Sequence, residues 1–106
     1  MAKSLIEIQM NYQKAKEQAN RLDEIAKDLT NTANNQLGGA LNGINSAWKS
    51  DTASAYIKKG KAVQEQLKKR ADELRKTASA IRTIARNTYN ADMAAYRLAI
   101  QRRYKG

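Results

Sequence analysis

Two stretches of the chain repeat apolar or small residues with the alternating four- and three-residue spacing of a helix that buries one narrow face. In the first half these positions are Ile8, Tyr12, Ala15, Ala19, Leu22, Ala26, Leu29 and Ala33. In the second half they are Tyr56, Gly60, Val63, Leu67, Ala71, Leu74, Ala78, Ile81 and Ala85. Polar and charged residues occupy most positions between them. The pattern predicts two long amphipathic helices, each with one buried stripe.

The first stripe becomes less regular before it ends. It continues through Leu37, Leu41 and Ile44 with a looser spacing. Several asparagines and glycines fall between residues 34 and 43, and both residue types lower intrinsic helix propensity. We therefore expect fraying or bending over about residues 38–50 rather than a strong helix.

A turn is predicted around Trp48, where three favourable N-cap residues follow in Ser50, Asp51 and Thr52. The expected elements are one helix over about residues 4–44, a turn over about 45–51 and a second helix over about 52–104. This is an all-α fold, a single antiparallel helix-turn-helix hairpin. Because two helices bury only one narrow face, we expect the hairpin to complete a four-helix bundle by dimerisation.

Composition removes most catalytic chemistry. The 106 residues include no Cys, His, Pro or Phe, so no thiol nucleophile, histidine base or zinc cluster can be built. The carboxylates of Asp23, Glu24 and Asp28, and those of Asp72 and Glu73, alternate with lysines and arginines, as on a solvated helix face. We expect no enzyme activity, no catalytic residue, no metal and no cofactor.

The net charge of +10 is distributed unevenly. Residues 1–51 hold six basic and six acidic residues, whereas residues 52–106 hold 14 basic and four acidic residues. Basic residues spaced by seven form one column along the second helix: Lys61, Lys68, Arg75 and Arg82. The column fits either a solvated face or a surface for an acidic protein partner. A basic nucleic-acid or membrane-surface binder is the alternative, and no motif for specific nucleic-acid recognition is present.

The last turns of the second helix carry two apolar faces. One is formed by Tyr89, Met93, Tyr96 and Ile100, followed by Tyr104, and the other by Thr88, Ala91, Ala95 and Leu98. The tyrosine stripe is either the buried stripe after a drift in register or an exposed surface for a partner. In an antiparallel hairpin it lies beside the chain start. The candidate partner-binding residues are Tyr89, Met93, Tyr96, Ile100, Leu5 and Ile6.

The stretch from Leu37 to Tyr89 resembles the WXG family, the small Trp-x-Gly proteins of bacterial type VII secretion systems. The resemblance rests on Leu41, Ile44, Ala47, Trp48, Lys49, Ser50, Ala53, Ala55, Tyr56, Val63, Leu67, Leu74 and Ile81. Trp48, Lys49 and Ser50 match the turn motif, with Ser50 where the family has Gly. The family's export signal often places an acidic residue four after a tyrosine, whereas Asp92 here is three after Tyr89.

The resemblance implies a secreted protein or export partner that acts by helix–helix association with itself or with an effector. An alternative is a non-enzymatic helical chaperone that stays bound to a toxin carrying an LXG domain. Implied partners are a second copy or another helical, acidic or LXG-domain protein, together with the secretion machinery. Glu7 interrupts the apolar start of the chain, so a secretory signal is not expected. Export by a signal-peptide-independent route, from the cytoplasm, is implied instead, with membrane contact only through the secretion apparatus.

Overall fold

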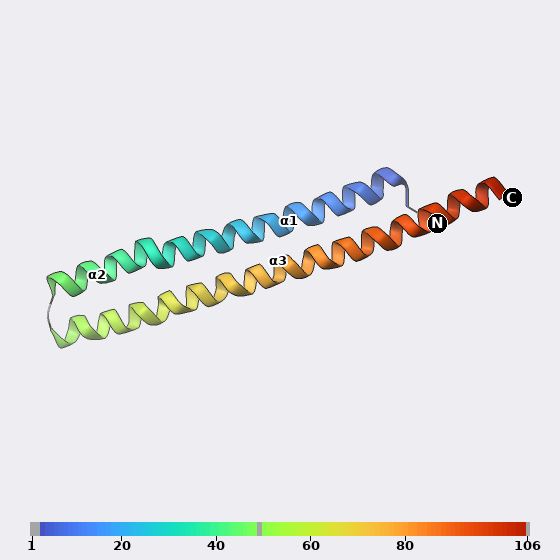
Figure 1. The fold of residues 1–106 in the computed structure, drawn as a ribbon. Coiled ribbons are helices and arrows are strands. Elements are labelled where there is room, and N and C mark those ends of the chain that lie inside the picture. The colour runs from blue at the N-terminus through green and yellow to red at the C-terminus, as the bar shows by residue number, and fades with distance from the viewer. Residues whose placement is uncertain (1–2, 49, 106) are drawn as a thin grey trace. The chain divides into compact units, whose positions relative to one another are not determined.

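A computed structural model describes residues 3–48 and 50–105 of the chain, and almost all of them are helical (Figure 1). The elements are α1 (Leu5–Asn31), the π-helical segment η1 (Thr32–Leu37), α2 (Gly38–Ala47) and α3 (Asp51–Lys105). The described part of the chain contains no strand, so the predicted all-α fold is confirmed. No helix in these two ranges is both long and apolar enough to cross a membrane.

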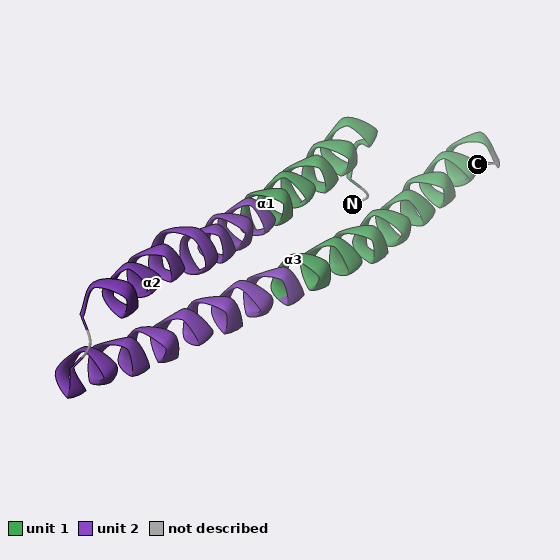
Figure 2. Cartoon of the chain, turned by 60° about the vertical axis from the view of Figure 1, so that its left-hand side comes forward, with its two compact units in different colours: residues 1–21, 77–106 green, residues 22–76 purple. Residues whose placement is uncertain are grey.

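The chain divides into two compact units, each of which pairs an earlier helical segment with part of α3 (Figure 2). Unit 1 comprises Met1–Arg21 and Thr77–Gly106, and unit 2 comprises Leu22–Lys76. In unit 1, the ring centroids of Tyr12 and Tyr89 are 4.8 Å apart, and Arg82 Nη2 donates to Asn20 Oδ1 at 2.8 Å. Residue numbers rise along α1 as they fall along α3, so the two segments are antiparallel.

Unit 2 contains the turn and has the same antiparallel pairing. Gln64 Nε2 donates to the Ala33 carbonyl at 2.8 Å, and Arg75 Nη2 donates to Thr30 Oγ1 at 2.9 Å. Nearer the turn, Gly60 lies against the side chain of Leu41. Unit 2 is therefore a helical hairpin, as predicted.

Small residues dominate the seam, the face that each helical segment buries against the other. The buried apolar residues are Ile8, Ala19, Ala26, Ala33, Leu41, Ala53, Ala71, Ala78 and Ala85. Tyr12, Ala15, Leu22 and Leu29 are half-buried, so the stripe predicted for the first helix is confirmed. Alanine lets helix backbones approach closely but removes little apolar surface from water.

The stripe predicted for the start of the second helix is wrong at two positions. Tyr56 and Val63 are 66% and 52% exposed. The seam instead uses Ala53, Ile57 and Gln64, which keep the four- and three-residue spacing back from Gly60. Ala53 is small and Gln64 is polar, so neither position stands out from the hydrophobic pattern, although both lie on the buried side.

The weak region of the first helix also lies earlier than predicted. Residues 38–47 are α-helical, and the irregular segment is η1. In the first helix the seam takes two successive four-residue steps, from Ala33 to Leu37 and Leu41, and the wider π turn accommodates the extra residue. The buried side chain of Leu41 ties α2 to α3, which offsets the low helix propensity of this segment.

Two glycines in unit 2 provide a matched test of this packing. A Cβ atom at Gly60 would overlap Leu41 Cδ2 and lie 3.0 Å from Cδ1, whereas a Cβ at Gly43 would meet nothing within 4 Å. We expect Gly60→Ala to lower the free energy of unfolding by about 1–2 kcal/mol through overpacking. Gly43→Ala should raise it by about 0.5–1 kcal/mol through helix propensity. Thermal unfolding followed by circular dichroism measures both, and equal shifts in the two variants would contradict the packing.

Candidate functional site

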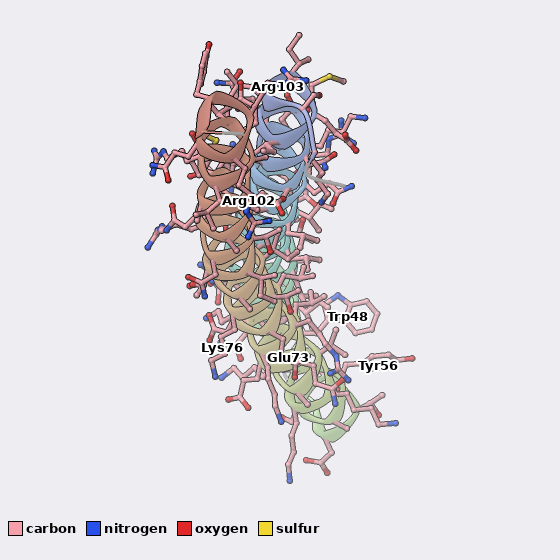
Figure 3. All side chains as sticks on the ribbon, turned by 90° about the vertical axis from the view of Figure 1, so that its right-hand side faces the viewer. Trp48, Tyr56, Glu73, Lys76, Arg102 and Arg103 are labelled. Carbon is pink, nitrogen blue, oxygen red and sulfur yellow. The ribbon has the colours of Figure 1, made fainter. Side chains whose placement is uncertain are left out.

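The turn presents its tryptophan to solvent. The backbone N–H of Trp48 donates to the Ile44 carbonyl at 2.8 Å and closes α2, after which Trp48 adopts an extended conformation with φ −125° and ψ 115°. This backbone turns the side chain away from the seam and leaves the residue 67% exposed. Figure 3 shows Trp48 and Tyr56 projecting on the same side of the helices. Lys49, the middle residue of the predicted turn motif, lies outside the described residues.

Ser50 is the N-cap of α3. Its Oγ accepts from the Ala53 N–H at 3.2 Å, and its carbonyl accepts from the Ser54 N–H at 3.0 Å. The side-chain bond satisfies a backbone donor that the first helical turn otherwise leaves unpaired, and the carbonyl bond is the first i→i−4 bond of α3. No described residue has a positive φ, so Ser50 does not need the backbone freedom of the glycine that the WXG motif carries. Beside this cap is a shallow depression lined by Asn45, Trp48, Ser50, Asp51, Ser54 and Ile57.

In unit 1, the predicted tyrosine stripe follows the seam. Tyr89, Met93, Tyr96 and Ile100 are all half-buried. Tyr89 stacks on Tyr12 with an interplanar angle of 32°. The expectation that this stripe lies beside the chain start is confirmed. Because these side chains contact the chain itself, their proposed role in partner binding stays a prediction.

The remaining predicted residues at this end differ in exposure. Leu5 is half-buried, whereas Ile6 is 70% exposed. Lys3 Nζ pairs with Asp92 Oδ2 at 3.3 Å. Asp92 therefore has an intramolecular partner in this structure, and the predicted relation of Tyr89 to Asp92 as an export signal stays untested.

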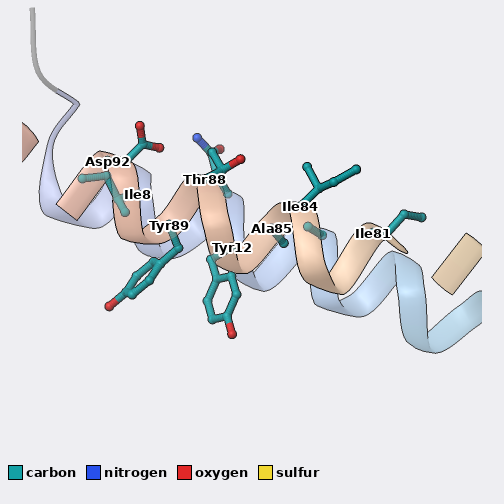
Figure 4. Close-up of a pocket in the computed structure, with 10 residues that line it drawn as sticks. Ile8, Tyr12, Ile81, Ile84, Ala85, Thr88, Tyr89 and Asp92 are labelled. Carbon is teal, nitrogen blue, oxygen red and sulfur yellow. The ribbon is translucent and has the colours of Figure 1, made fainter. Parts of the chain in front are cut away.

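An apolar groove opens between α1 and α3 in unit 1 (Figure 4). It is lined by Ile8, Asn11, Tyr12, Ala15, Ile81, Ile84, Ala85, Thr88, Tyr89 and Asp92. Ile84 is 63% exposed at its rim. Sequence reasoning missed Ile84 because its neighbours Ile81 and Ala85 already supply the seam. The sequence signal that could have identified Ile84 is its place directly before the seam residue Ala85, where a second apolar residue is not needed for the seam.

The predicted basic column divides into two kinds of residue. Lys61 and Lys68 are exposed in unit 2. Arg75 donates to Asp72 Oδ1 and to Thr30 Oγ1, both at 2.9 Å, and Arg82 donates to Asn20. The two arginines therefore form hydrogen bonds between helical segments within their units. Arg75 is nevertheless exposed, as the two lysines are, and Arg82 is half-buried.

The acidic side chains of the described residues do not form a metal site. Within residues 3–48 and 50–105, no three Asp or Glu side chains are grouped closely enough to hold a metal ion. Searches against models of protein families, curated proteins and solved structures find no match. Two surfaces are candidate functional features: the exposed Trp48 at the turn of unit 2, and the groove of unit 1.

The Ser50 cap gives a direct stability test. Ser50→Ala removes the side-chain acceptor and should lower the free energy of unfolding by about 1 kcal/mol, whereas Ser50→Gly should cost only about 0.3 kcal/mol. Ser46→Ala is the matched control, because the Ser46 hydroxyl donates to the Asn42 carbonyl of its own helix and caps no helix start. Urea titration measures all three variants. If Ser46→Ala costs as much as Ser50→Ala, the cap is not the cause.

The stacked tyrosines of unit 1 can be tested by a double-mutant cycle. Tyr12→Leu and Tyr89→Leu keep apolar volume at the seam but remove the paired rings. We expect a coupling of about 0.5–1.5 kcal/mol between the two substitutions in the free energy of unfolding. As a control, the cycle is repeated with the exposed Tyr104 instead of Tyr12. Tyr104→Leu and Tyr89→Leu should have additive effects on the free energy of unfolding. Additivity for Tyr12 and Tyr89 would contradict a stabilising contact.

Proposed function

We propose that this chain is a small, non-enzymatic substrate or export partner of a bacterial type VII secretion system. It acts by helix–helix association, with itself or with an effector such as an LXG-domain toxin. The observation that carries the proposal is the display of Trp48. A single tryptophan at the turn of a helical hairpin is 67% exposed, so its ring is accessible to another protein.

The turn supports the proposal through its local chemistry. Trp48 ends α2 in an extended conformation, and Ser50 begins α3 by capping it. The structure describes two residues of the WXG-like motif, and they differ in role. Trp48 is exposed at the surface, and Ser50 stabilises the start of α3. Serine in the third position fulfils the structural part without glycine.

The exposed apolar surface supports association as the mode of action. Trp48, Tyr56 and Val63 are each more than half exposed in unit 2. Large apolar side chains that gather on one side of a domain usually mark a protein interface. The groove of unit 1 offers a second concave surface.

Export from the bacterium that encodes the chain tests this function. We expect the protein in the culture medium of the wild-type strain and its retention when the ATPase of the secretion system is deleted. Trp48→Ala should reduce export about tenfold while the midpoint of thermal unfolding changes little, because the side chain is mostly exposed. Tyr104→Ala is the control, since Tyr104 is an exposed aromatic residue of unit 1, whereas the turn belongs to unit 2.

Three results would contradict the proposal. The first is export that does not depend on the ATPase. The second is normal export of Trp48→Ala. The third is an equal loss of export in Trp48→Ala and Tyr104→Ala, which would show that any exposed aromatic residue has the same effect.

A further inference from the structure

The last turns of α3 leave one apolar face without a partner among the residues that the structure describes. Because the seam of unit 1 runs through Tyr89 and Tyr96, the residues on the neighbouring side point to solvent. This outer face consists of Ile84, Thr88, Ala91, Ala95 and Leu98. Ile84 and Leu98 are 63% and 52% exposed, and the three residues between them are also exposed.

The outer face has the form that a helix needs for docking. Its members are spaced by four, three, four and three residues, so they form a straight ridge over residues 84–98, about 21 Å of helix. The centre is small, which permits close approach of a second helix, and a larger apolar side chain stands at each end. Ile84 and Thr88 also line the groove between α1 and α3, so the ridge and the groove are continuous.

Charge selects between the possible occupants. The segments of unit 1 contain ten basic and three acidic residues. The exposed Arg102 follows Leu98 by four residues and so extends the line of the outer face. Of the three acids, Asp92 already pairs with Lys3. A second copy would bring the same excess of basic charge to the interface, whereas an acidic helix would neutralise it.

We propose that the outer face, together with the groove, binds an amphipathic helix of an acidic protein. The apolar side of that helix packs on Ala91 and Ala95 between Ile84 and Leu98, and carboxylates at its edge pair with Arg102. This inference rests on the proposed function in one respect, that the chain acts by helix–helix association. It specifies which face is used and the charge of the partner.

A designed peptide pair tests the proposal with the full-length chain. One peptide is a helix of about 21 residues with leucines on one side and glutamates on the other, long enough to cover the face. The second has lysine in place of every glutamate. Fluorescence anisotropy of the labelled peptides should show that the acidic peptide binds at least about tenfold more tightly than the basic one.

Charge insertion at two positions locates the binding face. Ala91→Lys with Ala95→Lys should weaken binding of the acidic peptide about tenfold, because two long side chains block the ridge. Thr83→Lys with Asn90→Lys adds the same charge on another exposed side of α3 and should leave the affinity equal or higher. Leu98→Ala, which inserts no bulk, should weaken binding in the same direction as the first pair. Circular dichroism confirms that each variant is folded.

Several outcomes overturn the proposal. The first is an equal affinity for the two peptides, and the second is an equal effect of the two lysine pairs on the affinity. The third is displacement of the bound acidic peptide by anionic lipid vesicles. Another is a wild-type homodimer in sedimentation that Ala91→Lys with Ala95→Lys breaks, since the occupant is then a second copy. These readouts are independent of export, so failure of the peptide test with normal ATPase-dependent export rejects this face and leaves the proposed function standing.

Discussion

The structure depends on seams made largely of alanine. In both units the most buried positions are mainly methyl side chains, and Ile8 is the one large side chain that is fully buried among the described residues. A methyl group permits close helix packing, but its burial contributes little free energy compared with leucine or phenylalanine. The chain therefore stabilises itself by many small contacts. Larger apolar side chains such as Trp48, Tyr56 and Ile84 remain at the surface, where they are available to other molecules.

The long buried stripe of α3 explains where the tyrosines go. A straight helix drifts by about 20° per heptad from a strict seven-residue repeat, so five heptads correspond to about one residue of rotation. From Ala53 to Ala85 the seam keeps the heptad spacing, and it then takes a second four-residue step to Tyr89. The position that carries Arg75 and Arg82 on the flank of the seam thus becomes the seam itself at Tyr89. Register drift, one of the two interpretations open from the sequence, is the one that the structure adopts.

Sequence spacing predicted the fold class, the buried stripe of the first helix and the pairing of the chain start with the tyrosine stripe. It failed where hydrophobicity and geometry disagree. Tyr56 and Val63 are larger hydrophobic residues than Ala53, and Gln64 is polar, yet Ala53 and Gln64 lie on the buried side. Residues 38–47 are α-helical despite their low helix propensity, and within this segment Leu41 packs against Gly60 of α3. Exposure of Trp48 could not be read from spacing at all, because it follows from the extended backbone at the end of α2.

Different interactions would govern the association with a partner and the folding of the chain itself. The seams are mostly apolar and contain no buried charged side chain among the described residues, so added salt has little to screen there. The outer face of unit 1 is uncharged at its centre and continues into Arg102 at one end, within a strongly basic segment. The small alanine side chains would then determine how closely a partner helix packs. The exposed basic side chains would determine the association rate of an acidic partner. Raising the ionic strength should slow association with the acidic peptide, as measured by stopped-flow mixing at each salt concentration.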